Sequence, residues 1–140
     1  MTAERLDPSE PKRWLESARE DLAYGEGGRA AHPRPATWSF QQAGEKALKA
    51  VLLAKGRPVP RTHDVAFLLS GLVDIIPETK EVRDAVLLLA TITSASRYPD
   101  DSIDISPQDA AEFAQAARTI VEWAQPHCET TPNDISGKQQ

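Results

Sequence analysis

The sequence predicts an all-α protein, an up-and-down bundle of about five helices. Apolar residues recur every three or four positions in five segments, and proline, glycine or a capping residue bounds each segment. No segment shows the apolar and polar alternation of a strand. Because 140 residues suit one domain, we expect a helical domain over residues 9–126, an N-terminal lead-in over 1–8 and a disordered polar tail over 127–140.

Caps and glycines define the first two expected helices. Residues 7–10, DPSE, are typical of a helix start, because Asp7 can accept hydrogen bonds from first-turn amides and Glu10 can complete a capping box. Glycines at positions 25, 27 and 28 are expected to end this helix. The second helix should run from about Ala36 to Lys55 and stop at Gly56. Its broad apolar face predicts a place at the centre of the core: Phe40, Ala43, Ala47, Leu48, Val51 and Leu52.

Gly44 stands inside the second expected helix. A glycine there costs about 1 kcal/mol relative to alanine, so we expect another helix or a second subunit to approach closely. Together with Ala43 and Ala47, Gly44 forms a stretch of small residues on which helix backbones can meet. On this basis the sequence predicts a homodimer.

Three further helices complete the expected bundle. Thr62 is expected to cap the third, with Val65, Phe67, Leu68, Leu69 and Leu72 on its buried side. The fourth should span residues 78–96 through an apolar face of Val82, Ala85, Val86, Leu89 and Ile92. Ser106-Pro107-Gln108-Asp109 predicts a capping box for the fifth, which Pro126 should stop; its buried face is Phe113, Ala117, Ile120, Val121 and Ala124.

Charge is distributed unevenly along the chain. The net charge is −5, yet residues 1–73 hold 11 Lys and Arg against 9 Asp and Glu, whereas residues 74–140 hold 5 against 12. Basic residues gather from Lys46 to Arg61, either as a local positive patch or as a solvated face. No apolar run is long enough to span a membrane, and the single Cys128 cannot form an internal disulfide. We expect a cytoplasmic protein.

Several of these segments together resemble the HEPN domain family. The resemblance rests on QQAGEKALKAVLLAKG at 41–56, Pro60, the THD of residues 62–64 and the RYPD of residues 97–100. Within the family, the chain resembles the group of HEPN proteins found beside minimal nucleotidyltransferases. The resemblance covers roughly residues 9–126. The resemblance implies an all-α bundle that usually dimerises and acts in nucleotide-related, RNA-related or toxin–antitoxin systems.

Many HEPN proteins are metal-independent ribonucleases, and the resemblance raises that activity as an alternative. Such enzymes use an Arg and a His late in the bundle, a cation for the phosphate and an imidazole for the proton of the ribose 2′-hydroxyl. Here YPDDSIDIS follows Arg97 and contains no histidine. Arg57 and His63 have five residues between them but flank a loop, so they form a displaced alternative pair. The sequence does not favour an enzyme.

The candidate ligand-binding residues are Gln42, Lys46, Lys49, His63, Arg97 and Tyr98. His63 either hydrogen-bonds its own loop or faces a ligand together with the lysines, and Arg97 binds either a carboxylate of this protein or a phosphate. Tyr98 either stacks on a base or packs in the core. Apart from the adjacent His127 and Cys128, no histidine or cysteine pair has the spacing of a metal site, and no glycine-rich phosphate loop is present, so no metal or cofactor is expected.

These observations predict a binding and interaction module. We expect it to bind a nucleotide and to partner a minimal nucleotidyltransferase, without intrinsic catalysis. RNA is a target that the net charge of −5 does not favour.

Overall fold

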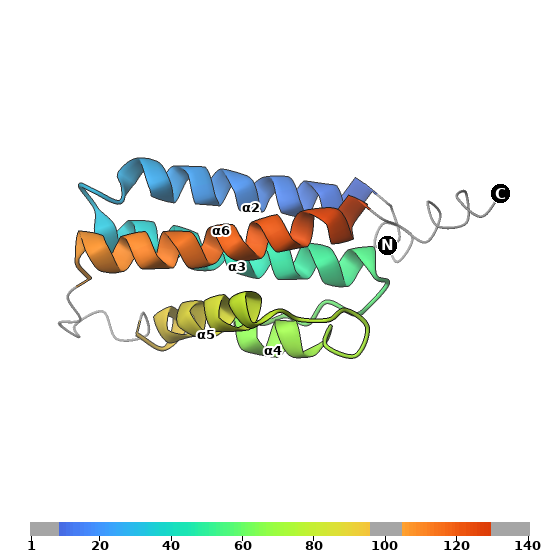
Figure 1. The fold of residues 1–140 in the computed structure, drawn as a ribbon. Helices are drawn as coiled ribbons and strands as arrows, with labels where there is room; N and C mark the ends of the chain where they lie inside the picture. The colour runs from blue at the N-terminus through green and yellow to red at the C-terminus, as the bar shows by residue number, and fades with distance from the viewer. Residues whose placement is uncertain (1–8, 96–104, 130–140) are drawn as a thin grey trace.

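The protein is a bundle of α-helices. The computed structural model describes residues 9–95 and 105–129, and it contains no strand within them. Its helices are α2 (Ser9–Gly28), α3 (Pro33–Ala54), α4 (Val65–Ser70), α5 (Lys80–Ala95) and α6 (Pro107–Glu129). The long helices α2, α3 and α6 lie side by side, and α4 and α5 pack along one side of them (Figure 1). The all-α, up-and-down fold predicted from the sequence is confirmed.

Helix α3 occupies the centre of the bundle. It contacts each of the other four helices, and Phe40, Leu48 and Val51 are fully buried in its apolar face. The apolar residues of α3 recur at helical spacing and so form a broad apolar side. This side is removed from water when it packs against the neighbouring helices, which stabilises the bundle. The position expected for this helix is confirmed.

Gly44 lies where α5 and α6 press against α3. A Cβ at this position would stand 2.6 Å from Cδ1 of Leu89 and 3.5 Å from Cδ1 of Ile120. The close approach expected here therefore occurs within the chain. Ala43 and Ala47 are also fully buried. The small residues are consequently not available to a second subunit. The prediction that they form the dimer surface is wrong.

Glycine positions were less reliable guides to helix ends. Helix α2 continues through Gly25 and Gly27 to Gly28, so the first two do not end it. A Cβ at Gly25 would lie 2.5 Å from the Phe40 ring, which explains why glycine is needed there. Helix α3 begins at Pro33, earlier than expected, because proline suits the first turn. Gly56, with a φ of +69°, has the left-handed geometry predicted for the end of α3.

The short helix α4 differs from its expected form in two ways. Asp64, not Thr62, is the N-cap: its Oδ1 accepts a hydrogen bond from the amide of Phe67 at 3.1 Å. Thr62 instead accepts a hydrogen bond from the amide of Asp64 at 3.0 Å. Phe67 is 56% exposed and so does not belong to the buried side. Burial of Val65, Leu68, Leu69 and Leu72 is confirmed.

Helices α5 and α6 close the core. The five apolar residues expected to face inward from α5 are buried: Val82, Ala85, Val86, Leu89 and Ile92. At the start of α6 the amide of Asp109 donates to Ser106 Oγ and the amide of Ser106 donates to Asp109 Oδ2, at 3.0 and 3.1 Å, which confirms the capping box. Ala117, Ile120, Val121 and Ala124 are buried and Phe113 is partly buried.

The C-terminal end of α6 was predicted wrongly. The helix passes through Pro126 and reaches Glu129. Proline removes one backbone donor from a helix, but Cys128 is fully buried, and its packing against the core holds the last turn in place. Burial also raises the pKa of the Cys128 thiol to about 12, so the group stays protonated. The rest of the expected tail, residues 130–140, lies outside the described residues.

No helix among the described residues is long and apolar enough to cross a membrane.

Candidate functional site

Helix α3 carries polar residues on the side that faces α2 and the segment leading to α4. Gln41, Glu45 and Lys49 follow one another at four-residue spacing and therefore lie in one row along the helix. All three are buried, with Gln41 fully so. A buried polar row on an otherwise apolar helix requires partners, because an unpaired polar group in the interior is costly.

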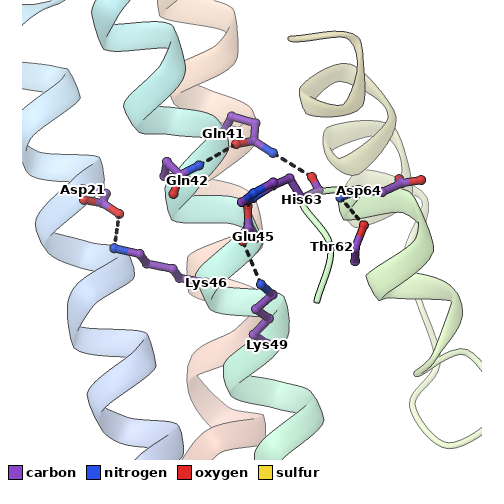
Figure 2. Close-up of polar contacts among 9 residues, drawn as sticks. All are labelled: Asp21, Gln41, Gln42, Glu45, Lys46, Lys49, Thr62, His63 and Asp64. Atoms are coloured by element: carbon purple, nitrogen blue, oxygen red, sulfur yellow. Dashed lines mark hydrogen bonds and ion pairs between the residues drawn. The ribbon is translucent and has the colours of Figure 1, made fainter. Parts of the chain in front are cut away.

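Glu45 is the centre of this row. Its Oε2 lies 2.8 Å from Nζ of Lys49, and its Oε1 lies 2.9 Å from Nδ1 of His63. Gln41 Nε2 donates a hydrogen bond to the main-chain carbonyl of His63 at 2.9 Å. Two side chains of α3 therefore hold the residue that precedes the cap of α4 (Figure 2). The imidazole itself is 69% exposed.

Lys46 joins the same helix to α2. Its Nζ lies 2.8 Å from Oγ of Ser17 and 2.8 Å from Oδ2 of Asp21. Lys49 also lies over the ring of Trp14, with Nζ 5.8 Å from the ring centroid. Both lysines are thus engaged by residues of their own chain, and Figure 2 shows Lys46 reaching across to Asp21 of α2.

Gln42 completes the group. Its Nε2 donates to Oε1 of Gln41 at 3.1 Å, which links it to the row that holds His63. The structure therefore brings four predicted ligand-binding residues to one side of α3: Gln42, Lys46, Lys49 and His63. Arg97 and Tyr98 lie outside the described residues.

The alternative pair of Arg57 and His63 has separate partners. Arg57 donates to both carboxylate oxygens of Asp74, at 3.2 and 3.0 Å, and its NH1 lies 3.5 Å from the carbonyl of Gly71. These hydrogen bonds from Arg57 hold the pKa of Asp74 below its usual value. Within the described part of the chain no contact joins the guanidinium to the imidazole, so the pair is not assembled as a catalytic unit.

Sequence reasoning left Glu45 and Gln41 out of the candidate site, although both support His63. The spacing of the sequence indicated them, because Glu45 follows Gln41 by four residues and precedes Lys49 by four, which places all three on one side of a helix. Ser17 and Asp21 on α2 were also missed, and no local pattern marks them as partners of Lys46. The described residues contain no group of three His, Cys, Asp or Glu side chains that could hold a metal ion.

The fold and the polar row define an all-α bundle protein whose central helix α3 anchors the segment that leads into α4. The family model of the HEPN domain matches residues 11–127. The chain therefore belongs to the HEPN domain family, as the sequence resemblance indicated.

Two solved structures are similar to this chain. The crystal structure of TT1696 from Thermus thermophilus is 26% identical, with a TM-score of 0.76 over 85% of this chain and 98% of that one. ST0689, described as an archaeal HEPN homologue, is 22% identical, with a TM-score of 0.69 over 84% of this chain and 97% of that one, and supports the fold alone. No protein of curated function matches the chain.

Proposed function

We propose that this HEPN-domain protein is a cytoplasmic binding and interaction module without intrinsic catalysis. It binds a nucleotide and partners a minimal nucleotidyltransferase, in a toxin–antitoxin-like or other nucleotide-related system. The observation that supports a binding role is the gathering of Gln42, Lys46, Lys49 and the exposed imidazole of His63 along one side of α3 (Figure 2). The resemblance to nucleotidyltransferase-associated HEPN proteins supplies the class of ligand and partner.

Calorimetric titration with ATP, GTP, AMP and GMP tests the nucleotide site. We expect a saturable heat change with at least one of the four, and we expect His63→Ala to weaken that binding about fivefold, since a hydrogen bond at a binding site is worth roughly 1 kcal/mol. Lys80→Ala is the matched control, because Lys80 is an exposed cation that pairs with Asp84 on its own helix α5. No heat change with any nucleotide would contradict the proposed site.

The partner is tested separately. A gene for a small nucleotidyltransferase beside the gene for this chain would support the pairing. Co-expression of the two products should then yield one complex on affinity purification. Recovery of the two proteins as separate species would contradict it.

We also propose that the protein is a homodimer, on a surface other than the buried stretch of Ala43, Gly44 and Ala47. Light scattering should report about twice the chain mass of 15.3 kDa. A monomer at tens of micromolar protein would contradict this proposal.

Ribonuclease activity is not expected. The net charge of −5 repels polyanions at long range, and Asp74 already engages the guanidinium of Arg57. Purified protein should leave single-stranded RNA intact without metal. Cleavage that disappears in a His63→Ala variant of unchanged stability would overturn this expectation and restore the alternative of a HEPN ribonuclease with a displaced Arg57 and His63 motif.

A further inference from the structure

The carboxylate of Glu45 is almost completely buried, with 6% of its side chain exposed. Lys49 neutralises one oxygen at 2.8 Å, and His63 faces the other at 2.9 Å. Burying a carboxylate is costly unless its oxygens accept hydrogen bonds, and here the two oxygens have one donor each. The pair with His63 is therefore part of what makes this buried charge tolerable.

The same contact decides which ring nitrogen of His63 carries the hydrogen. A carboxylate paired with an ammonium group can only accept hydrogen bonds, so the nitrogen that faces it, Nδ1, must be the donor. In a neutral imidazole the other nitrogen then has a free lone pair. Glu45 consequently selects, for the neutral ring of His63, the tautomer in which Nε2 is the acceptor.

The backbone around His63 is fixed as well. Gln41, fully buried, holds the carbonyl of His63, and the next residue, Asp64, caps α4 through the amide of Phe67. The imidazole nevertheless remains 69% exposed, and no hydrogen bond or ion pair to its Nε2 comes from residues 9–95 or 105–129. The imidazole is therefore fixed in position by Glu45 and Gln41 and is exposed to solvent. Its Nε2 is accessible to a ligand.

We infer that His63 presents Nε2 as a fixed hydrogen-bond acceptor, and that it recognises a donor group of the bound nucleotide, a ribose hydroxyl or a base amino group. This inference rests on the proposed nucleotide site and specifies what His63 does in it. An ionised phosphate oxygen is not the partner of Nε2 in the neutral ring, because both atoms are hydrogen-bond acceptors and neither carries a hydrogen to donate. His63 is thus a specificity residue and not a phosphate ligand.

The form of the imidazole is measured without any ligand. Long-range ¹H–¹⁵N correlation spectra of the wild-type protein at about pH 8, where an ordinary imidazole is neutral, should show His63 with its hydrogen on Nδ1. In Glu45→Gln the ammonium of Lys49 takes the amide oxygen, so the amide NH₂ faces Nδ1 and the hydrogen should move to Nε2. A wild-type ring with its hydrogen on Nε2 would overturn the inference, whatever the variant does.

Recognition is measured with matched nucleotides. The probes are the nucleotide that binds in the titration above (ATP, GTP, AMP or GMP), its 2′,3′-dideoxy analogue, and the analogue that lacks the exocyclic amino group. Wild-type protein should bind one analogue about fivefold more weakly than the parent, because one hydrogen bond to Nε2 is lost. Loss of affinity for the dideoxy analogue identifies a ribose hydroxyl, and loss for the other identifies the amino group.

The Glu45→Gln variant should abolish this difference, whereas Lys80→Ala should keep it. Equal binding of all three nucleotides by the wild type, or full discrimination by Glu45→Gln, would overturn the recognition step. A purely structural tether would change stability and leave the ratio between nucleotides unmoved. If none of the four nucleotides binds, the proposed function fails and the recognition step fails with it, while the spectra still judge the form of the ring.

Discussion

Two lysine–carboxylate pairs in this protein have the same local geometry and different surroundings. Glu45 and Lys49 on α3 are four residues apart with an N···O distance of 2.8 Å, and Lys80 and Asp84 on α5 are four apart at 2.7 Å. The side chains of Glu45 and Lys49 are 6% and 11% exposed, whereas those of Lys80 and Asp84 are 76% and 54% exposed. Distance alone would rank them as equals. Exposure to water distinguishes the two pairs. An exposed pair is screened by solvent and adds little stability, whereas a buried charge depends on its partner to offset the cost of its burial.

The exposed pair shows how little a shifted titration says about stability. The hydrogen bond between the two side chains lowers the pKa of Asp84 and raises the pKa of Lys80. Both groups nevertheless remain in water, which solvates either of them when the other is removed. Among the described residues, only the α3 pair is connected by a hydrogen bond to a further segment, through His63 just before α4.

Removal of the buried carboxylate is the strongest test of this difference. Glu45→Ala leaves the ammonium of Lys49 in the interior without its partner and detaches the imidazole of His63. We expect the free energy of unfolding to fall by about 3–5 kcal/mol, the range for breaking a buried ion pair. Denaturation in urea, followed by circular dichroism, measures the change.

Asp84→Ala is the matched control, because it removes the carboxylate of a pair with equal spacing and distance. Its unfolding midpoint in urea should coincide with that of the wild type. Equal losses in the two variants would show that burial does not distinguish the pairs.

The comparison also explains what the sequence could predict. Apolar spacing predicted the five helices, and local chemistry predicted the capping box at Ser106, since every participant lies within one helical turn. The polar row at Gln41, Glu45 and Lys49 is visible in the spacing. Its connection to His63 is not, because that contact spans 18 residues and depends on how the segment before α4 folds back.

Glycine and proline were misread for the same reason. Backbone preferences are local, but Gly25 is required by a ring on another helix, and Pro126 is tolerated because Cys128 is buried beyond it. Phe67 has the spacing of a core residue and is exposed, since a six-residue helix can bury only one narrow side. Arg97 and Tyr98 stay predictions.

Two glycines of α2 sharpen the contrast between buried and open positions at a smaller scale. A Cβ at Gly25 would meet the Phe40 ring at 2.5 Å, whereas a Cβ at Gly27 would meet nothing within 4 Å. Gly25→Ala should destabilise by about 1–2 kcal/mol, because overpacking outweighs the gain in helix propensity. Gly27→Ala should stabilise by about 0.5–1 kcal/mol, since only the propensity term acts.

Urea denaturation of both variants decides this. Midpoints that move in opposite directions are expected. A Gly25→Ala variant as stable as Gly27→Ala would mean that the Phe40 ring moves aside at no cost, and that the close packing of α2 on α3 does not require glycine.

The smallest expected effect concerns His127, near the end of α6, which is half-buried and lies 5.1 Å from the Trp123 ring. Burial, and secondarily the charge of Lys55, lowers the pKa of His127 below its ordinary value of 6.5. The unfolded chain therefore takes up a proton at a higher pH than the folded one. The stability that the neutral ring provides is fully present above about pH 6.5 and is lost as the pH falls from there through the folded-state pKa.

Urea midpoints of wild type and His127→Gln, compared between about pH 7.5 and pH 5, isolate this contribution, because the carboxylates titrate alike in both proteins. We expect the wild type to lose slightly more stability than the variant over that interval. Identical losses would mean that the C-terminal turn of α6 leaves the imidazole as accessible to protons as it is in the unfolded chain.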